Sequence, residues 1–284
     1  MARLRGAWRA LRRSWRGPHE IALFAAAYLT YFGVRALTEG GIPRAVVNAR
    51  DLFRLEHAVR VDWERPAQSV ILHSTTLRGA VDAIYIYGHW PVLIVGGVLL
   101  FNLARPQYFR LRNVCLLSGA IGLVIFAVFP VAPPRLAGLG FVDTITMHAH
   151  GYRTVMPPSL VNEYAAMPSF HAGWNLMLGI ALFRATSKLA LRMLAAALPL
   201  AMGFATVATA NHFVLDVLAG CAIVVLSYYL VEHMERGPTL VGDDSHARAR
   251  GATHPRAVRG RTPRGERHSG AATRRAARRP SRRG

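Results

Sequence analysis

Long apolar segments separated by short polar ones make up most of the chain. A helix that crosses a bilayer needs about 20 mostly apolar residues. Six segments approach or reach that length: Ile21–Leu37, Ile84–Leu103, Val114–Phe129, Phe170–Phe183, Leu189–Ala210 and Phe213–Val231. The fourth is short, and completes a span only with the residues around Ser169 or Arg184. The pattern predicts an all-α polytopic membrane protein, a bundle of six transmembrane helices.

The basic residues predict an orientation, because Lys and Arg concentrate on the cytoplasmic flanks of membrane helices. Most of the 35 Lys and Arg residues fall at the two ends of the chain and in the two short loops on the same side. Both termini are therefore expected in the cytoplasm, with 38–83, 130–169 and 209–212 extracytoplasmic. We expect an integral protein of a bacterial plasma membrane.

Composition divides the chain into three parts. Residues 1–19 form a basic cytoplasmic N-terminus, and residues 20–236 form the membrane domain. Residues 237–284 are rich in Arg, Gly, Ser and Pro and have too few apolar residues to fold. This tail supplies most of the net charge of +20. We expect it to remain disordered and to attract anionic lipid or keep the chain soluble, with no specific nucleic-acid partner. Nothing in the pattern indicates an oligomeric state.

Two histidines open two of the apolar segments. His171 lies in "MPSFHAGW" at the start of the fourth, and His212 lies in "NHFVLDVLAG" at the start of the sixth. Both of these helices run inward, so both histidines are predicted at the extracytoplasmic face. Asp216 lies four residues after His212, on the same helical face. It is placed to accept a hydrogen bond from one ring nitrogen and leave the other free to attack.

Two further residues favour an anion at this face. Arg135 follows the third segment in "FPVAPPRL", and a guanidinium presents a fork of donors that suits a phosphate. Ser169 is placed to act as a helix N-cap or as a donor to the phosphate, and helix N-termini themselves attract anions. Each signal alone is weak. Together they predict one phosphate pocket at the ends of three helices, with no metal and no cofactor.

Two other classes of protein would use the same side chains. A proton-coupled transporter would relay protons through His171, His212 and Asp216. Transporter sites lie near the bilayer midplane, however, and the sequence shows neither an inverted repeat nor a broken helix pair. A metal hydrolase would use these three residues as ligands, but the charge of Arg135 beside them opposes a cation. Cys115 and Cys221 lack metal-ligand spacing and are expected to pack as small apolar residues.

These motifs resemble those of the phosphatidic acid phosphatase type 2 superfamily. The closer resemblance is to its inositolphosphotransferase-like branch, which includes the aureobasidin-resistance proteins that make inositol phosphorylceramide. "MPSFHAGW" is similar to the PSxH motif and "NHFVLDVLAG" to the final HxxxD motif, and the resemblance covers roughly residues 80–232. "YIYGHWP" also resembles a segment of this branch. It makes His89 either a secondary polar site or an interfacial histidine beside a proline kink.

The resemblance implies a membrane phosphatase or phosphotransferase that acts on a lipid phosphate at the outer leaflet. His212 would be the nucleophile that forms a phosphohistidine, Asp216 its orienting residue and His171 the general acid. Arg135 would match the arginine of the first motif. The motifs do not say whether water or an alcohol such as inositol accepts the phosphoryl group.

The sequence departs from the superfamily pattern at two places. The lysine expected before Arg135 is absent near Val128 and Phe129, and Ala205 and Thr206 replace a serine–arginine pair before the final histidine. These departures agree better with the transferase-like branch.

The extracytoplasmic loops carry weaker signals. "RDLFRLEHAVRVDWE" predicts an amphipathic interfacial helix that either guides lipid entry or acts as a structural cap, with apolar positions at Leu52, Phe53, Leu55, Val59 and Val61. The loop 137–163 is expected to shape the headgroup site, with contributions from Arg153 and from His148 or His150.

Overall fold

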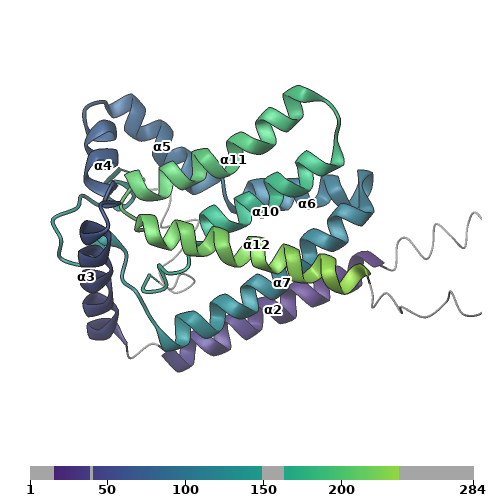
Figure 1. Cartoon of the computed structure of the whole chain (residues 1–284), viewed down its shortest axis with the longest axis horizontal. Helices are drawn as coiled ribbons and strands as arrows, with labels where there is room; N and C mark the ends of the chain where they lie inside the picture. The colour runs from purple at the N-terminus through teal and green to yellow at the C-terminus, as the bar shows by residue number, and fades with distance from the viewer. Residues whose placement is uncertain (1–15, 39–40, 149–162, 237–284) are drawn as a thin grey trace, which may run out of the picture. The chain divides into compact units, whose positions relative to one another are not determined.

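The computed structural model describes residues 16–38, 41–148 and 163–236, and these residues are almost entirely helical (Figure 1). The elements are α2 (Arg16–Thr38), α3 (Ile42–Ala58), α4 (Glu64–Leu72), α5 (Thr75–Tyr87), α6 (Trp90–Leu103), α7 (Arg105–Val128), the 3₁₀ turn η1 (Pro134–Leu136), α8 (Thr144–His148), α10 (Phe170–Ala185), α11 (Leu189–Ala208) and α12 (Val214–Arg236). The predicted all-α class is confirmed. The expected tail at 237–284 and the residues before 16 lie outside the described residues.

Three of the described helices, α7, α11 and α12, are long and apolar enough to cross a membrane. The pair α5 and α6 adds a fourth span if the two helices cross together. These helices support an integral membrane protein. Each of the six predicted segments is helical, but the count of six spans is not confirmed. α10 has 16 residues, or about 24 Å of helix, against a hydrocarbon core of about 30 Å.

The second predicted span, residues 84–103, is two helices instead of one. α5 ends at Tyr87, α6 begins at Trp90, and the two helices are bent by 50° at the break. Pro91 lies in the first turn of α6 and has no N–H to donate to the preceding turn, so a continuous helix is disfavoured there. The expectation that the chain has no broken helix pair is therefore wrong for this segment.

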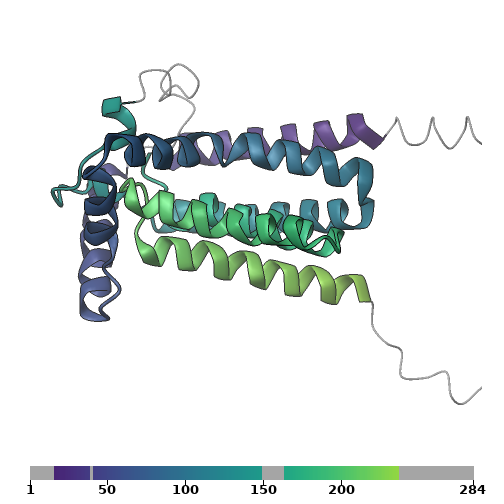
Figure 2. The same ribbon diagram turned by 90° about the horizontal axis from the view of Figure 1, so that it is seen from above.

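α10 is the central helix of the described bundle. It packs against α6, α7, α11 and α12, and the long helices run along a common direction (Figure 2). Its buried side chains meet those of its neighbours in an apolar core that contains Leu100, Val114, Met177, Leu178, Ala181 and Val224. The core fixes the helices whose first residues carry the histidines.

α3 lies at a steep angle to the start of α12 (Figure 1). Its buried face consists of Ala45, Ala49, Leu52 and Glu56, spaced at three and four residues as a helix requires. The helix expected in this loop is present. Of the predicted apolar positions, Leu55 and Val59 are exposed, so only part of the apolar stripe faces the bundle.

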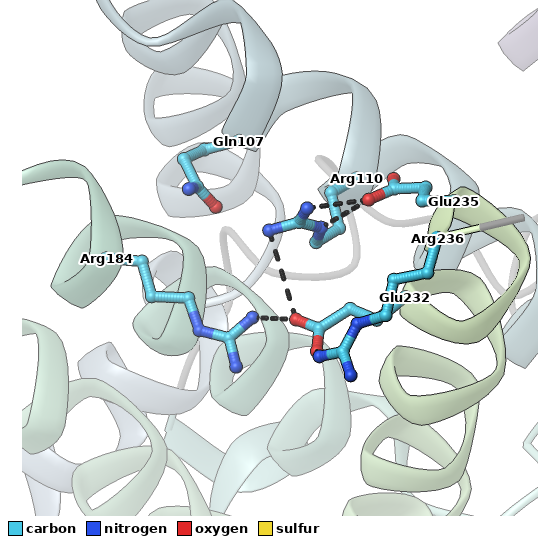
Figure 3. Close-up of a pocket in the computed structure, with 6 residues that line it drawn as sticks. All are labelled: Gln107, Arg110, Arg184, Glu232, Glu235 and Arg236. Carbon is cyan, nitrogen blue, oxygen red and sulfur yellow. Dashed lines mark hydrogen bonds and ion pairs between the residues drawn. The ribbon is translucent and has the colours of Figure 1, made fainter. Parts of the chain in front are cut away.

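Ion pairs join the start of α7 to the ends of α10 and α12 (Figure 3). Arg110 of α7 contacts Glu235 of α12 at 2.6 Å, and Arg184 of α10 pairs with Glu232 of α12. Arg236 also reaches Glu232, at 3.8 Å. These residues line a small pocket, and each of its three arginines has a carboxylate partner. The cluster therefore joins helix ends and is not an open anion site.

Candidate functional site

The two predicted histidines face each other. His171 lies in the first turn of α10, and His212 precedes the first turn of α12. The Nε2 atom of His212 is 3.4 Å from the Nδ1 atom of His171. The structure therefore brings together two residues that are far apart in sequence, one at the start of each helix.

Two glycines allow this close approach of α10 and α12. A Cβ on Gly220 would lie 2.1 Å from the Ser169 carbonyl oxygen, and a Cβ on Gly173 would lie 2.7 Å from the Gly220 carbonyl oxygen. The Ser169 N–H also donates to the Asp216 carbonyl at 2.9 Å. The helices touch backbone to backbone beside the histidines, so their separation leaves no room for a side chain.

A tight turn after α11 delivers His212 to this position. Ala210 has a φ of 54°, a left-handed conformation that strains a residue with a Cβ. The turn lets the N–H groups of Asn211 and His212 both donate to the Thr206 carbonyl, at 3.0 and 3.1 Å. Ala210 is fully buried, so packing around it maintains the strained turn.

The imidazole of His212 is held in one tautomer. Its Nδ1 lies 2.8 Å from the carbonyl oxygen of Ala166 and 3.5 Å from Oδ2 of Asp216. A carbonyl oxygen only accepts hydrogen bonds, so Nδ1 must carry the proton. In the neutral ring the lone pair is then on Nε2, the atom that faces His171.

Asp216 is fully buried and supports both His212 and the helix start. Its Oδ2 accepts the Phe213 N–H at 2.9 Å, and Oδ1 has no hydrogen-bond partner among the described residues. The sequence predicted Asp216 as the orienting acceptor for His212. In the structure Asp216 shares that role with the Ala166 carbonyl, which is closer.

Ser169 occupies the N-cap position of α10, as predicted, but its side chain makes no capping bond. Its Oγ is buried and has no hydrogen-bond partner within the described part of the chain. An unpaired buried hydroxyl is costly, and this one lies beside a helix N-terminus that attracts anions.

The described side-chain contacts of Arg135 are with the residue before His212 and with two acidic residues. Its Nε donates to Oδ1 of Asn211, the residue before His212, at 2.9 Å. Its Nη atoms reach Asp143 at 3.2 Å and Glu163 at 3.6 Å. The guanidinium is tied to the turn that carries His212, and its described contacts are with these three residues.

His171 is enclosed by aromatic rings. Tyr85 stacks on it with centroids 4.7 Å apart, and the ring of His89 lies 4.3 Å away, centroid to centroid. His89 stands at the break between α5 and α6, is buried, and has no partner for Nδ1 among the described residues. The structure shows features of both readings, because His89 lies against His171 and also at a helix break beside Pro91.

Sequence reasoning missed two acidic residues. Glu64 accepts the Val214 N–H at 2.8 Å, and Glu56 accepts the Leu215 N–H at 2.6 Å. The signal for Glu56 was its place at the next helical step after Ala49 and Leu52 on the buried face of α3.

Other predicted contributors lie outside the description. His150 and Arg153 are not among the described residues, and the side chain of His148 is not described either. Across the described ranges, no group of three or more His, Cys, Asp or Glu residues is arranged to hold a metal ion.

The fold and the site together define a class of protein. It is a membrane-helix protein in which two histidines, one of them oriented by an acid, meet at the starts of two helices. A model described as the PAP2 superfamily matches residues 50–230, well over half of the chain. The chain belongs to the PAP2 superfamily, whose members are phosphatases. No curated protein and no solved structure matches it.

The superfamily resemblance seen in the motifs is therefore confirmed, and the match begins earlier in the chain than residue 80, where the motif resemblance began. It takes in the helices α3 and α4 that carry Glu56 and Glu64. The inositolphosphotransferase-like branch within the superfamily stays a prediction.

Proposed function

We propose that the protein is a membrane phosphatase or phosphotransferase that transfers the phosphoryl group of a lipid phosphate through a phosphohistidine at His212. The observation that carries the proposal is the pair of contacts made by the His212 ring. Nδ1 is held by the Ala166 carbonyl at 2.8 Å, and Nε2 faces His171 at 3.4 Å. A nucleophile needs one nitrogen fixed and the other free.

His171 is assigned the general acid role. It would protonate the departing oxygen as Nε2 of His212 attacks phosphorus, and then accept a proton from the incoming water or alcohol. His171 faces Nε2 from the opposite side, so a phosphoryl group that enters between the two rings would present its leaving oxygen to His171, opposite the attacking nitrogen. Asp216 would stabilise the charge on the His212 ring.

Ser169 and Arg135 are assigned to the substrate phosphate. The unpaired Ser169 hydroxyl and the first N–H groups of α10 supply donors beside His171. Arg135 contacts Glu163 at 3.6 Å, and this carboxylate is partly exposed. A phosphate would displace it, and the guanidinium would gain a dianion that it binds in bidentate fashion.

The departures from the superfamily pattern favour the transferase-like branch, with an alcohol such as inositol as the acceptor. We further propose that the site faces the extracytoplasmic side, with residues 1–19 and 237–284 in the cytoplasm on either side of a membrane domain at 20–236. The distribution of basic residues supports this orientation.

The test is phosphate release or transfer by the purified protein, assayed with a panel of lipid phosphates in EDTA, with and without alcohol acceptors. We expect activity in the wild type, and a loss of about a thousandfold or more in His212→Ala. His233→Ala is the matched control, because His233 is exposed in the last turn of α12. Undiminished activity in His212→Ala would refute the mechanism, and strict dependence on added metal would refute metal independence.

A proton-coupled transporter is the second candidate, favoured by the bent pair α5 and α6. Discontinuous helices are typical of transporter sites, and His89 at this break lies against His171. Flux of a phosphorylated solute into sealed proteoliposomes without phosphate release would favour this candidate. Phosphate release without flux would exclude it.

A further inference from the structure

The start of α12 is capped by three carboxylates from three different elements. The N–H groups of Phe213, Val214 and Leu215 are consecutive, and each donates to a different acid. Asp216 is on α12 itself, whereas Glu64 is on α4 and Glu56 is on α3. A helix N-terminus has free N–H groups and a positive dipole end, and capping usually requires one side chain.

Both glutamates are fully buried, with an exposed fraction of 0%. Each uses Oε1 for α12, and each leaves a buried Oε2 with no N–H or hydroxyl donor from the other described residues. The two carboxyls also lie close enough for each to shift the pKa of the other. Two neighbouring buried carboxyls are costly to ionise together, so we expect the pair to hold one proton in common.

The charges around the pair agree with this arrangement. Burial, together with the charges of Glu64 and Asp216, raises the pKa of Glu56 to about 9. Burial also raises the pKa of Glu64, and Asp62 adds to that rise. Opposing these carboxylates are the N–H groups of Val214 and Leu215. At neutral pH the pair is therefore expected to keep a proton.

We propose that Glu56 and Glu64 are positioning residues: two buried carboxyls that cap the first turn of α12 and so keep His212 and Asp216 in register with His171. This rests on the proposed function of the histidines. The pair acts on the backbone at residues 214 and 215, which lie between Phe213, the residue after His212, and Asp216. It does not touch the reacting atoms.

The cap that Glu56 and Glu64 form on α12 is predicted to weaken at high pH. When the shared proton is lost, two adjacent buried carboxylates repel each other and Asp216, and the cap on α12 loosens. Activity should therefore fall as the pH rises toward about 9. Stability should fall as well, from about pH 4.5 to about pH 9, because over that range the folded state binds a proton that the unfolded state has released.

Glu56→Gln tests whether the titration of this carboxyl, and not only its hydrogen bonding, is needed. The amide oxygen can still accept the Leu215 N–H, and the amide NH₂ can donate to a neighbouring carboxylate as a protonated carboxyl would, but the amide cannot be titrated. We expect this variant to keep kcat within a few-fold at pH 7 and to lose the alkaline fall in both kcat and thermal stability. Glu56→Ala and Glu64→Ala leave an N–H without its acceptor. They should lower kcat about ten- to a hundredfold with little change in KM, because a displacement of about 1 Å costs that much.

The experiment measures kcat, KM and thermal unfolding from about pH 6 to 10 for these variants and for Glu235→Gln, a control at the other end of α12. The inference is overturned if Glu56→Gln keeps the wild-type alkaline fall, or if folded alanine variants retain wild-type kcat. Failure of the alanine variants to fold leaves the glutamine comparison decisive. If the wild type releases no phosphate, the unfolding curves still test the shared proton, so the two proposals fail separately.

Discussion

His212 is placed by contacts that reach it from several parts of the chain. The Ala166 carbonyl fixes its Nδ1, the Thr206 carbonyl holds its backbone N–H, and His171 faces its Nε2. None of these contacts requires a charged partner. The Asp216 carboxylate adds a negative charge 3.5 Å from Nδ1, which favours the cationic ring that forms when Nε2 binds phosphorus.

The roles of the two histidines predict different responses to the leaving group. His171→Ala removes the proton donor, so turnover of an alkyl phosphate should fall by about 10² to 10⁴. An aryl phosphate with a good leaving group needs no proton, and formation of the phosphoenzyme from it should be nearly unaffected. Rapid-quench measurement of phosphoenzyme formation and of phosphoenzyme breakdown, with both substrates, checks this. Equal losses of phosphoenzyme formation for both substrates would contradict the acid role.

Asp216→Asn tests the buried carboxylate. The amide oxygen can still accept the Phe213 N–H, so the helix start should remain intact, while the negative charge beside His212 is lost. We expect kcat to fall by about 10² to 10⁴ with thermal stability close to that of the wild type. Steady-state kinetics and a melting curve on the same preparation check it. A wild-type kcat in the folded variant would exclude the charge-stabilising role.

At this scale the sequence predicted that the two histidines would meet but not what surrounds them. The helix-start positions of His171 and His212, and the four-residue spacing to Asp216, are local patterns that can be read directly. The contacts from Ala166, Glu56 and Glu64 join residues separated by 46, 159 and 150 positions. Contacts of such long range depend on the packing of whole elements, which local periodicity does not specify.

Among the elements, the approach of α10 to α12 sets the distance between the histidines. A Cβ on Gly220 would lie 2.1 Å from the Ser169 carbonyl, so Gly220→Ala must push the two helix starts apart. We expect a stability loss of about 1–3 kcal/mol and a loss in kcat of about a hundredfold. Unfolding and turnover measurements check this.

Gly97→Ala on α6 is the matched control, because a Cβ there meets nothing within 4 Å. It should leave stability and turnover close to the wild type. If Gly220→Ala behaved like this control, the backbone contact would not be what positions the histidines.

The apolar segments predicted from sequence are all helical, because continuous apolar runs of this length have few other ways to satisfy their backbone in a membrane. The break at His89 was expected only as a proline kink in one reading of that residue, and the predicted span ran through it, because the apolar pattern resumes directly after Pro91. The predicted fourth span is the helix α10, which has 16 residues. It is short for a membrane span, but it contacts four other helices and so positions them around the site.

For the molecule as a whole, charge marks one end of the described bundle. Arg110, Arg184, Glu232 and Glu235 join the ends of α7, α10 and α12 that lie farthest along each helix from the histidines. Partly exposed ion pairs of this kind contribute about 0–1 kcal/mol each. They say more about position than about stability. Charged groups favour the water on either side of the hydrocarbon core, so these residues mark an end of the helices that lies near the membrane surface.

The proposed orientation predicts opposite accessibility for two exposed residues. A cysteine at Ser74, the N-cap of α5, should react in intact cells with a membrane-impermeant maleimide, whereas a cysteine at Lys188 before α11 should react only after permeabilisation. Both are made in a background where Cys115 and Cys221 are replaced by alanine. The reverse pattern would place the histidine site on the cytoplasmic side.

The central claim is tested most directly by isolating the phosphorylated enzyme. Purified protein is mixed with a lipid phosphate labelled in its phosphoryl group, quenched within one turnover in alkali, and digested for mass spectrometry. The account predicts an alkali-stable, acid-labile phosphoryl group on His212 that disappears when acceptor is in excess. Phosphate release without a labelled protein, or a label on any other residue, would contradict it.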